Sequence, residues 1–95
     1  MSIVKDPAEI ITVTFDFSAL ATAASNPTIT CTVFGSVADQ AASSMLTGSP
    51  QVSGTSVLQR VSGGISGATY KLRCVIDDAD GERWVVADRL EVVTA

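Results

Sequence analysis

Residues 69–77 read TYKLRCVID, a stretch in which every second side chain is apolar. These apolar positions are Tyr70, Leu72, Cys74 and Ile76. The residues between them are charged, apart from one valine. A period of two predicts a β-strand with one face toward a core and the other toward solvent.

A hairpin and a return strand are predicted after this segment. Residues 77–81 read DDADG, and Gly81 suits a left-handed backbone position in a tight loop. Residues 82–93 are predicted as the return strand, in which four apolar residues share one parity: Trp84, Val86, Leu90 and Val92. Asp88 interrupts that parity, so we expect a β-bulge near Asp88 or an ion pair with Arg73 or Arg89.

Three earlier segments also have the composition of strands. Residues 9–17 alternate, residues 28–33 place threonine on one face and apolar residues on the other, and residues 51–61 carry a strand that Gly54 can split. The segments between them are predicted as a loop (18–26), a break (35–40), a short strand or an irregular crossing (41–46), and a turn (48–50).

Six or seven short strands without a helical period predict an all-β fold. The spacing of the strands favours an immunoglobulin-like antiparallel β-sandwich. The length of 95 residues suits one domain. We assign residues 9–95 to this domain and residues 1–8 to an N-terminal arm.

The composition indicates a surface that other proteins cover. Charged residues make up only 17% of the chain, whereas about 25% is usual, and small free domains rely on charge for solubility. The alternative is a monomer with a neutral surface of serine, threonine and glycine. The six Lys and Arg residues are scattered singly, so neither nucleic acid nor a membrane is expected as a partner.

Two further absences in the sequence limit the location and the chemistry. No apolar block precedes Pro7 and no stretch reaches the roughly 18 apolar residues of a membrane span, so we expect a protein made in the cytoplasm. There is no histidine, which removes Ser–His and Cys–His nucleophiles. The acidic loop at 77–82 faintly resembles a calcium loop, but a solvated hairpin explains it. We expect no catalytic residue, cofactor or metal.

The two cysteines are predicted to have a structural role. Cys31 and Cys74 both lie on the inward faces of predicted strands. They are either free buried thiols, which are common in cores, or a disulfide between opposite sheets as in immunoglobulin domains.

Five more residues are assigned structural roles. Tyr70 follows Gly67 at the entry to its strand, where its hydroxyl either turns back to the preceding connection, as in a tyrosine corner, or lies at the rim of the core. Trp84 is a core residue or an interface anchor. Gly64, Gly67 and Gly81 are assigned to turns.

Three segments together resemble a phage family. They are KDPAEI at 5–10 leading into TFDFS at 14–18, VSGG at 61–64 followed by Gly67 and Tyr70, and the last hairpin from GER at 81–83 to LEVV at 90–93. In this order they are similar to the small fibre–tail adaptor proteins of tailed bacteriophages. The similarity thins out between residues 35 and 51, and Phe17 stands where the family commonly has tryptophan.

This resemblance implies a non-enzymatic virion protein, assembled in the cytoplasm of a bacterial host. It implies a homo-oligomeric ring that links tail or neck to fibres, with other virion proteins as partners. We expect Val4, Lys5, Asp6 and Pro7 in the arm to contact a neighbouring subunit. Two alternatives stay open: a decoration protein of the phage head, and a small carbohydrate- or ligand-binding module.

Overall fold

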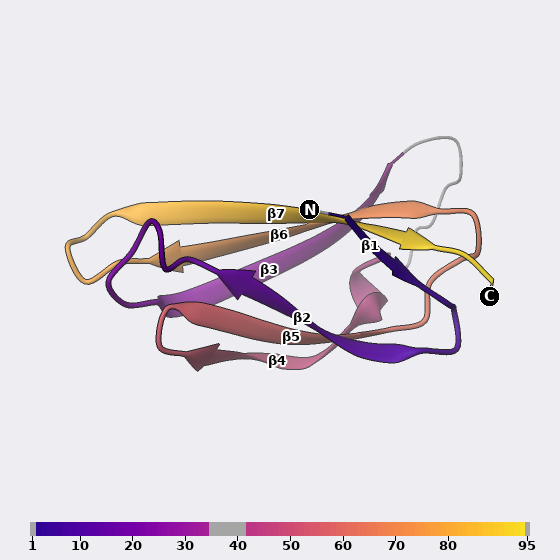
Figure 1. Cartoon of the computed structure of the whole chain (residues 1–95), viewed down its shortest axis with the longest axis horizontal. Helices are drawn as coiled ribbons and strands as arrows, with labels where there is room; N and C mark the ends of the chain where they lie inside the picture. The colour runs from indigo at the N-terminus through magenta and orange to yellow at the C-terminus, as the bar shows by residue number, and fades with distance from the viewer. Residues whose placement is uncertain (1, 35–41, 95) are drawn as a thin grey trace.

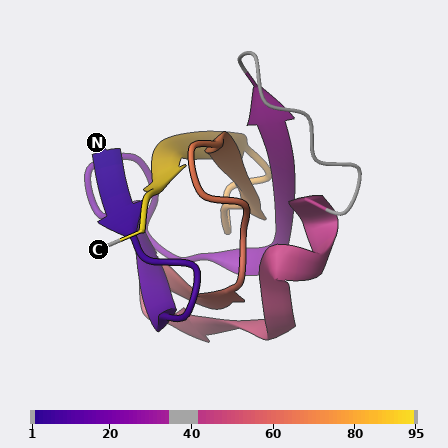
Figure 2. The same cartoon turned by 90° about the vertical axis from the view of Figure 1, so that its right-hand side faces the viewer.

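The computed structural model of the chain describes residues 2–34 and 42–94. Two β-sheets face each other, and their strands run along the long axis of the molecule (Figures 1 and 2). The elements are β1 (Ser2–Lys5), β2 (Ile10–Asp16), β3 (Ser25–Phe34), the 3-10 turn η1 (Ala42–Met45), β4 (Leu46–Ser53), β5 (Ser56–Ser62), β6 (Thr69–Asp77) and β7 (Arg83–Val92).

The strand order is that of an immunoglobulin-like sandwich. One sheet has the order β1-β7-β6-β3 and the other β2-β5-β4. Omitting β1, these sheets correspond to the C-F-G and B-E-D strands of immunoglobulin domains. All pairs are antiparallel except β1 with β7, which is parallel. The predicted all-β sandwich is therefore confirmed.

The core lies between the sheets and is built by the alternation seen in the sequence. In β6 the buried positions are every second residue, and the same alternation holds over much of β7 in the same sheet and of β5 in the opposite sheet. Each fully buried large apolar side chain stabilises the fold by about 1.5–3 kcal/mol. The largest of them are Tyr70, Phe15, Phe17, Leu72, Ile76 and Leu90.

The turn predicted at residues 48–50 is wrong, because this segment lies inside β4. The pairing of β4 with β5 shifts register between Thr47 and Gln51, and this irregularity accommodates the residues predicted to turn. Pro50 is tolerated because β4 is an edge strand. The buried side chain of Gln59 donates hydrogen bonds to the carbonyls of Thr47 and Gly48, both at 3.2 Å, so the irregular backbone keeps its partners.

Other boundaries differ less from the prediction. The segment 41–46 contains the turn η1. Strand β3 begins at Ser25, with a register shift before Thr28. Asn26 therefore lies within the strand, at a positive φ of 49°. Asparagine tolerates that conformation better than most residues. The split at Gly54 is confirmed, whereas the predicted break at 35–40 lies outside the described residues.

The N-terminal segment differs from the predicted arm. Residues Ser2–Lys5 form β1, which adds to the edge of the molecule's own sheet in parallel with the end of β7. Ile3 packs against the core and Lys5 is buried, so apolar burial and backbone hydrogen bonds hold the segment in place. A four-residue strand is too short to show a period in sequence.

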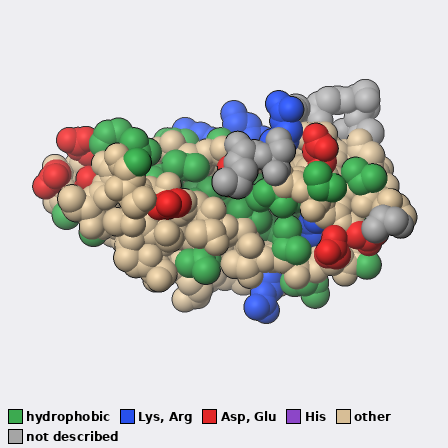
Figure 3. Space-filling view, viewed as in Figure 1, with side chains coloured by type: hydrophobic (Ala, Val, Ile, Leu, Met, Phe, Trp, Pro, Cys, Tyr) green, Lys and Arg blue, Asp and Glu red, His purple; other side chains and the backbone are tan. Residues whose placement is uncertain are grey.

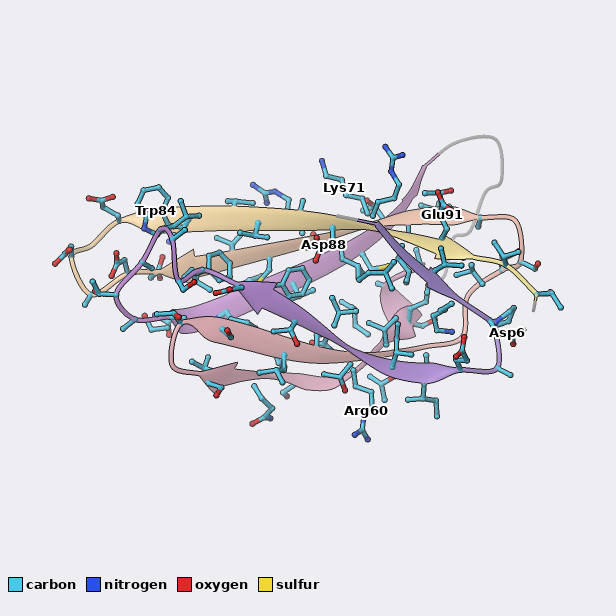
Figure 4. The ribbon with its side chains drawn as sticks, viewed as in Figure 1. Asp6, Arg60, Lys71, Trp84, Asp88 and Glu91 are labelled. Atoms are coloured by element: carbon cyan, nitrogen blue, oxygen red, sulfur yellow. The ribbon has the colours of Figure 1, made fainter. Side chains whose placement is uncertain are left out.

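Asp88 is accommodated without the expected bulge. The register between β6 and β7 is continuous, and Asp88 lies opposite Leu72 with its side chain turned inward (Figure 4). Arg73 and Arg89, the two expected ion-pair partners, lie at positions of the opposite, outward parity. β1 covers β7 only from Arg89 onward. An inward charge beside an open strand edge discourages further strands from pairing there.

Candidate assembly surface

Lys5 is the centre of a junction between β1 and the connection from β5 to β6. Its side chain is only 1% exposed, and its ammonium donates to the carbonyl oxygens of Gly63 at 2.7 Å and Asp6 at 2.8 Å. Burial lowers the pKa of Lys5, while the nearby charges of Glu9 and Asp6 oppose that shift. Because the partners are carbonyls of a neighbouring turn, Lys5 clamps that turn to β1.

The next four residues form a closed turn that carries the chain from one sheet to the other. The Asp6 carboxylate accepts from the Ala8 N–H at 2.8 Å, and the Glu9 carboxylate accepts from the Asp6 N–H at 2.6 Å. The motif K-D-P-x-E is thus explained by a turn that satisfies its own backbone. Of the four residues predicted to reach a neighbour, Val4 alone has an exposed side chain, at 66%; Lys5 is buried, and Asp6 and Pro7 are half-buried.

The glycine-rich connection at 62–70 packs against the same junction. Gly64 has φ of +101°, and a Cβ there would lie 2.8 Å from a methyl of Val92. Gly67 has φ of +90° in open space, and its N–H donates to the Val92 carbonyl at 2.7 Å. The hydroxyl of the fully buried Tyr70 accepts from the Ile65 N–H at 2.9 Å, so it turns back to the preceding connection.

Replacing Tyr70 with phenylalanine should remove this hydrogen bond and leave the ring in place. We expect the free energy of unfolding to fall by about 1 kcal/mol, because the Ile65 N–H loses its partner. Urea denaturation measures the change. An unaltered midpoint would mean that the ring alone accounts for the role of Tyr70.

The cysteines are free thiols, and both are buried. They lie on β3 and β6 of one sheet, where Cys31 faces Leu72 and Cys74 faces Ile29, whereas the disulfide of immunoglobulin domains joins opposite sheets. Burial raises the pKa of Cys74 to about 11. A thiol of that pKa is protonated at neutral pH and therefore a poor nucleophile.

The opposite end of the sandwich is organised around Asp78. Its carboxylate accepts from the Ala79 N–H at 2.6 Å, from Thr22 at 3.2 Å and from the indole of Trp84 at 3.4 Å, so the β6–β7 hairpin is tied to the loop after β2. Trp84 is half-buried and packs on the core (Figure 4). Gly81 closes the hairpin with φ of +84°.

Acid should weaken this hairpin end. Burial raises the pKa of Asp78, but the hydrogen bonds from Ala79, Trp84 and Thr22 outweigh it, and the pKa lies below its ordinary value of 3.8. A carboxylate with a lowered pKa stabilises the fold above the unfolded-state pKa, and this contribution is lost as the pH falls through the folded-state value. Between about pH 5 and about pH 2, unfolding free energies should therefore fall more in the wild type than in Asp78→Asn. Parallel curves would contradict this.

Three of the six cationic residues lie close together on the outer face of the four-stranded sheet. Lys71 lies directly opposite Arg89, and Arg73 lies two residues along β6; all three are exposed. Figure 3 shows basic side chains along the margin above β6 and β7. These charges are single in sequence but clustered in the fold, which the sequence analysis missed. The cluster could have been recognised from the alternation along the two strands. Its cations occupy the positions between the inward-facing residues, which include Tyr70 and Leu90.

Metal sites and membrane-spanning helices were sought in residues 2–34 and 42–94. In this part of the chain, no group of three His, Cys, Asp or Glu residues could hold a metal ion. Nor does this part contain a helix of the length and hydropathy needed to span a membrane.

A family model described as podophage GP4 fiber-tail adaptor protein gp77 matches residues 5–90. The chain belongs to this family. The match begins at Lys5, the last residue of β1, and its range includes the turn at residues 6–9 and the glycine-rich connection at 62–70. Neither a curated protein nor a solved structure matches the chain.

Proposed function

We propose that this chain is a non-enzymatic structural subunit of a phage particle that links the tail or neck to the fibres, as one of several copies in a ring. The observation that carries the proposal is the adaptor-family match over residues 5–90, which takes in nearly the whole sandwich. Assembly in the host cytoplasm and a place in the finished virion belong to the same proposal.

The surface supports a role in assembly. Four large apolar side chains, each at least 43% exposed, lie on segments that converge at the Lys5 junction. They are Val4, Ile10, Ile65 and Val93. Backbone hydrogen bonds and the Lys5 clamp connect these segments: the Val93 N–H, for example, donates to the Lys5 carbonyl at 2.9 Å. Exposed apolar residues grouped at one end of a domain favour contact with another protein.

The position of the junction also revises how the N-terminus would contact a neighbour. Because Lys5 is buried in its own sandwich, the segment acts as a fixed edge, and Val4 presents its side chain from that edge. A partner would meet a preformed surface and would not need to order a loose arm. Such preformed surfaces lower the entropic cost of association.

Cosedimentation tests the proposed role against the alternative of a head decoration protein. Labelled protein is mixed with isolated fibreless tails and, separately, with empty heads, and the bound fraction is measured. We expect saturable binding to tails and none to heads. Saturable binding to heads alone would overturn the adaptor role and establish the decoration role.

A further inference from the structure

We propose that the basic outer face of the β1-β7-β6-β3 sheet, centred on Lys71, Arg73 and Arg89, binds the acidic β6–β7 hairpin end of a second copy of this chain. The inference rests on the proposed function and names the contact that would join neighbouring ring subunits.

The basic face places two like charges side by side. Lys71 and Arg89 are direct cross-strand neighbours, and like charges in that position destabilise a sheet. Glu91, an acidic residue of this face, lies opposite Thr69, beyond the pair (Figure 4). Counted over Lys71, Arg73, Arg89 and Glu91, the described residues at the centre of this face have a formal charge of +2, although the whole chain carries −4.

The surroundings of these cations suit a protein contact. The flanking outward residues are small or uncharged, so that the face can be covered with little desolvation of charge. They are Thr28, Thr30 and Thr32 on β3, Val75 on β6, and Val85 and Ala87 on β7. Val85 is 43% exposed, which adds an apolar contact beside Arg73.

The complementary charge lies at the hairpin end of the same chain. Asp16, Asp77, Asp78, Asp80 and Glu82 against Arg83 give that end a formal charge of −4. Asp80 and Glu82 are exposed near the tip, while Asp77 is paired with Arg83 at 2.9 Å. Figure 3 shows acidic side chains at this end, away from the basic margin.

One molecule cannot bring these two regions together. Arg89 is six residues along β7 from Arg83, which corresponds to about 20 Å of strand. Two copies also cannot pair face to face, because a two-fold contact would place the +2 face against itself. The contact is therefore head-to-flank, and contacts of this type generate rings when the rotation closes.

Charge reversal with a matched control tests the contact. Lys71→Glu should weaken self-association at least about tenfold, whereas Arg60→Glu, the same charge change on the other sheet, should leave it nearly unaltered. Lys71→Glu replaces a like-charge pair with an opposite pair, so its melting temperature should not fall. Self-association should also weaken with salt. Light scattering and sedimentation measure the masses.

A mixing experiment identifies the geometry. Lys71→Glu keeps its acidic end, and Asp80→Lys/Glu82→Lys keeps its basic face, so each variant alone should be monomeric. Mixed in equal amounts they should form a dimer and nothing larger, since one intact contact remains. Failure of the mixture to associate would overturn the head-to-flank arrangement.

A wild-type protein that stays monomeric up to about 1 mM at low salt would overturn the inference. Failure of the proposed function is a separate result. A monomeric protein that still restores fibre attachment overturns the ring contact alone, whereas a protein that forms rings but restores no fibres overturns the adaptor role alone.

Discussion

Replacing Gly64 with alanine should lower the free energy of unfolding by about 3 kcal/mol or more. A positive φ costs an L-residue about 1–2 kcal/mol, and overpacking of a core costs a further 1–3 kcal/mol. Both costs apply here, because φ is +101° and the new Cβ would lie 2.8 Å from Val92 and 3.0 Å from Met45. Thermal and urea denaturation measure the loss.

Gly63→Ala is the matched control. Gly63 also has a positive φ, of +73°, but a Cβ there meets no atom within 4 Å. Only the backbone cost applies, so we expect a loss of about 1 kcal/mol. Equal losses in the two variants would show that contact with Val92 and Met45 is unimportant and that the connection can move away from the core.

Replacing Lys5 with methionine should lower the free energy of unfolding by about 3 kcal/mol. Methionine keeps an unbranched stem of similar length, but it leaves the carbonyls of Gly63 and Asp6 without their donor. Both hydrogen bonds are partly buried and have a charged donor, and a bond of this kind contributes about 1.5–3 kcal/mol. The loss should also loosen β1, so amide hydrogen exchange at Ile3 and Val4 should quicken more than exchange in β6.

Lys71→Met is the control for Lys5→Met. Lys71 is exposed on the outer sheet face and opposes Arg89, so its removal should cost nothing and relieve a like-charge pair. If Lys5→Met proved as stable as Lys71→Met, the buried ammonium would not be what holds β1 in place.

The parts of the fold that follow from local alternation were predictable. β6 and the hairpin to β7 are visible in the sequence because burial on one face imposes a period of two over nine or ten residues. Free buried thiols were one of two alternatives for the cysteines. The pairing of β3 with β6 decides between them by placing both cysteines in one sheet, which strand periodicity does not specify.

The parts that depend on distant partners were not predictable. β1 forms because the end of β7 offers an open edge and the Gly63 carbonyl accepts a hydrogen bond from Lys5. The sequence did not predict this, because lysine is rarely buried. Residues 48–50 have the composition of a turn. In the edge strand β4 they are accommodated by an irregular pairing with β5, and the Gln59 side chain donates a hydrogen bond to a backbone carbonyl there.

The basic sheet face was hidden for a related reason. Lys71 and Arg89 are 18 positions apart in sequence, and only the hairpin register makes them neighbours. The resemblance to fibre–tail adaptors, in contrast, rested on turn motifs whose residues the junction now explains: Lys5 clamps the connection at Gly63, and Tyr70 holds the Ile65 N–H.

Fibre attachment to particles that lack this protein tests its proposed role most directly. Particles from a phage with the gene deleted are imaged before and after purified protein and free fibres are added. We predict that the deletion leaves heads and tails without fibres and that the added protein restores fibres at the tail or neck. Fibres present on the deleted particles, or no restoration by folded protein, would contradict the adaptor role.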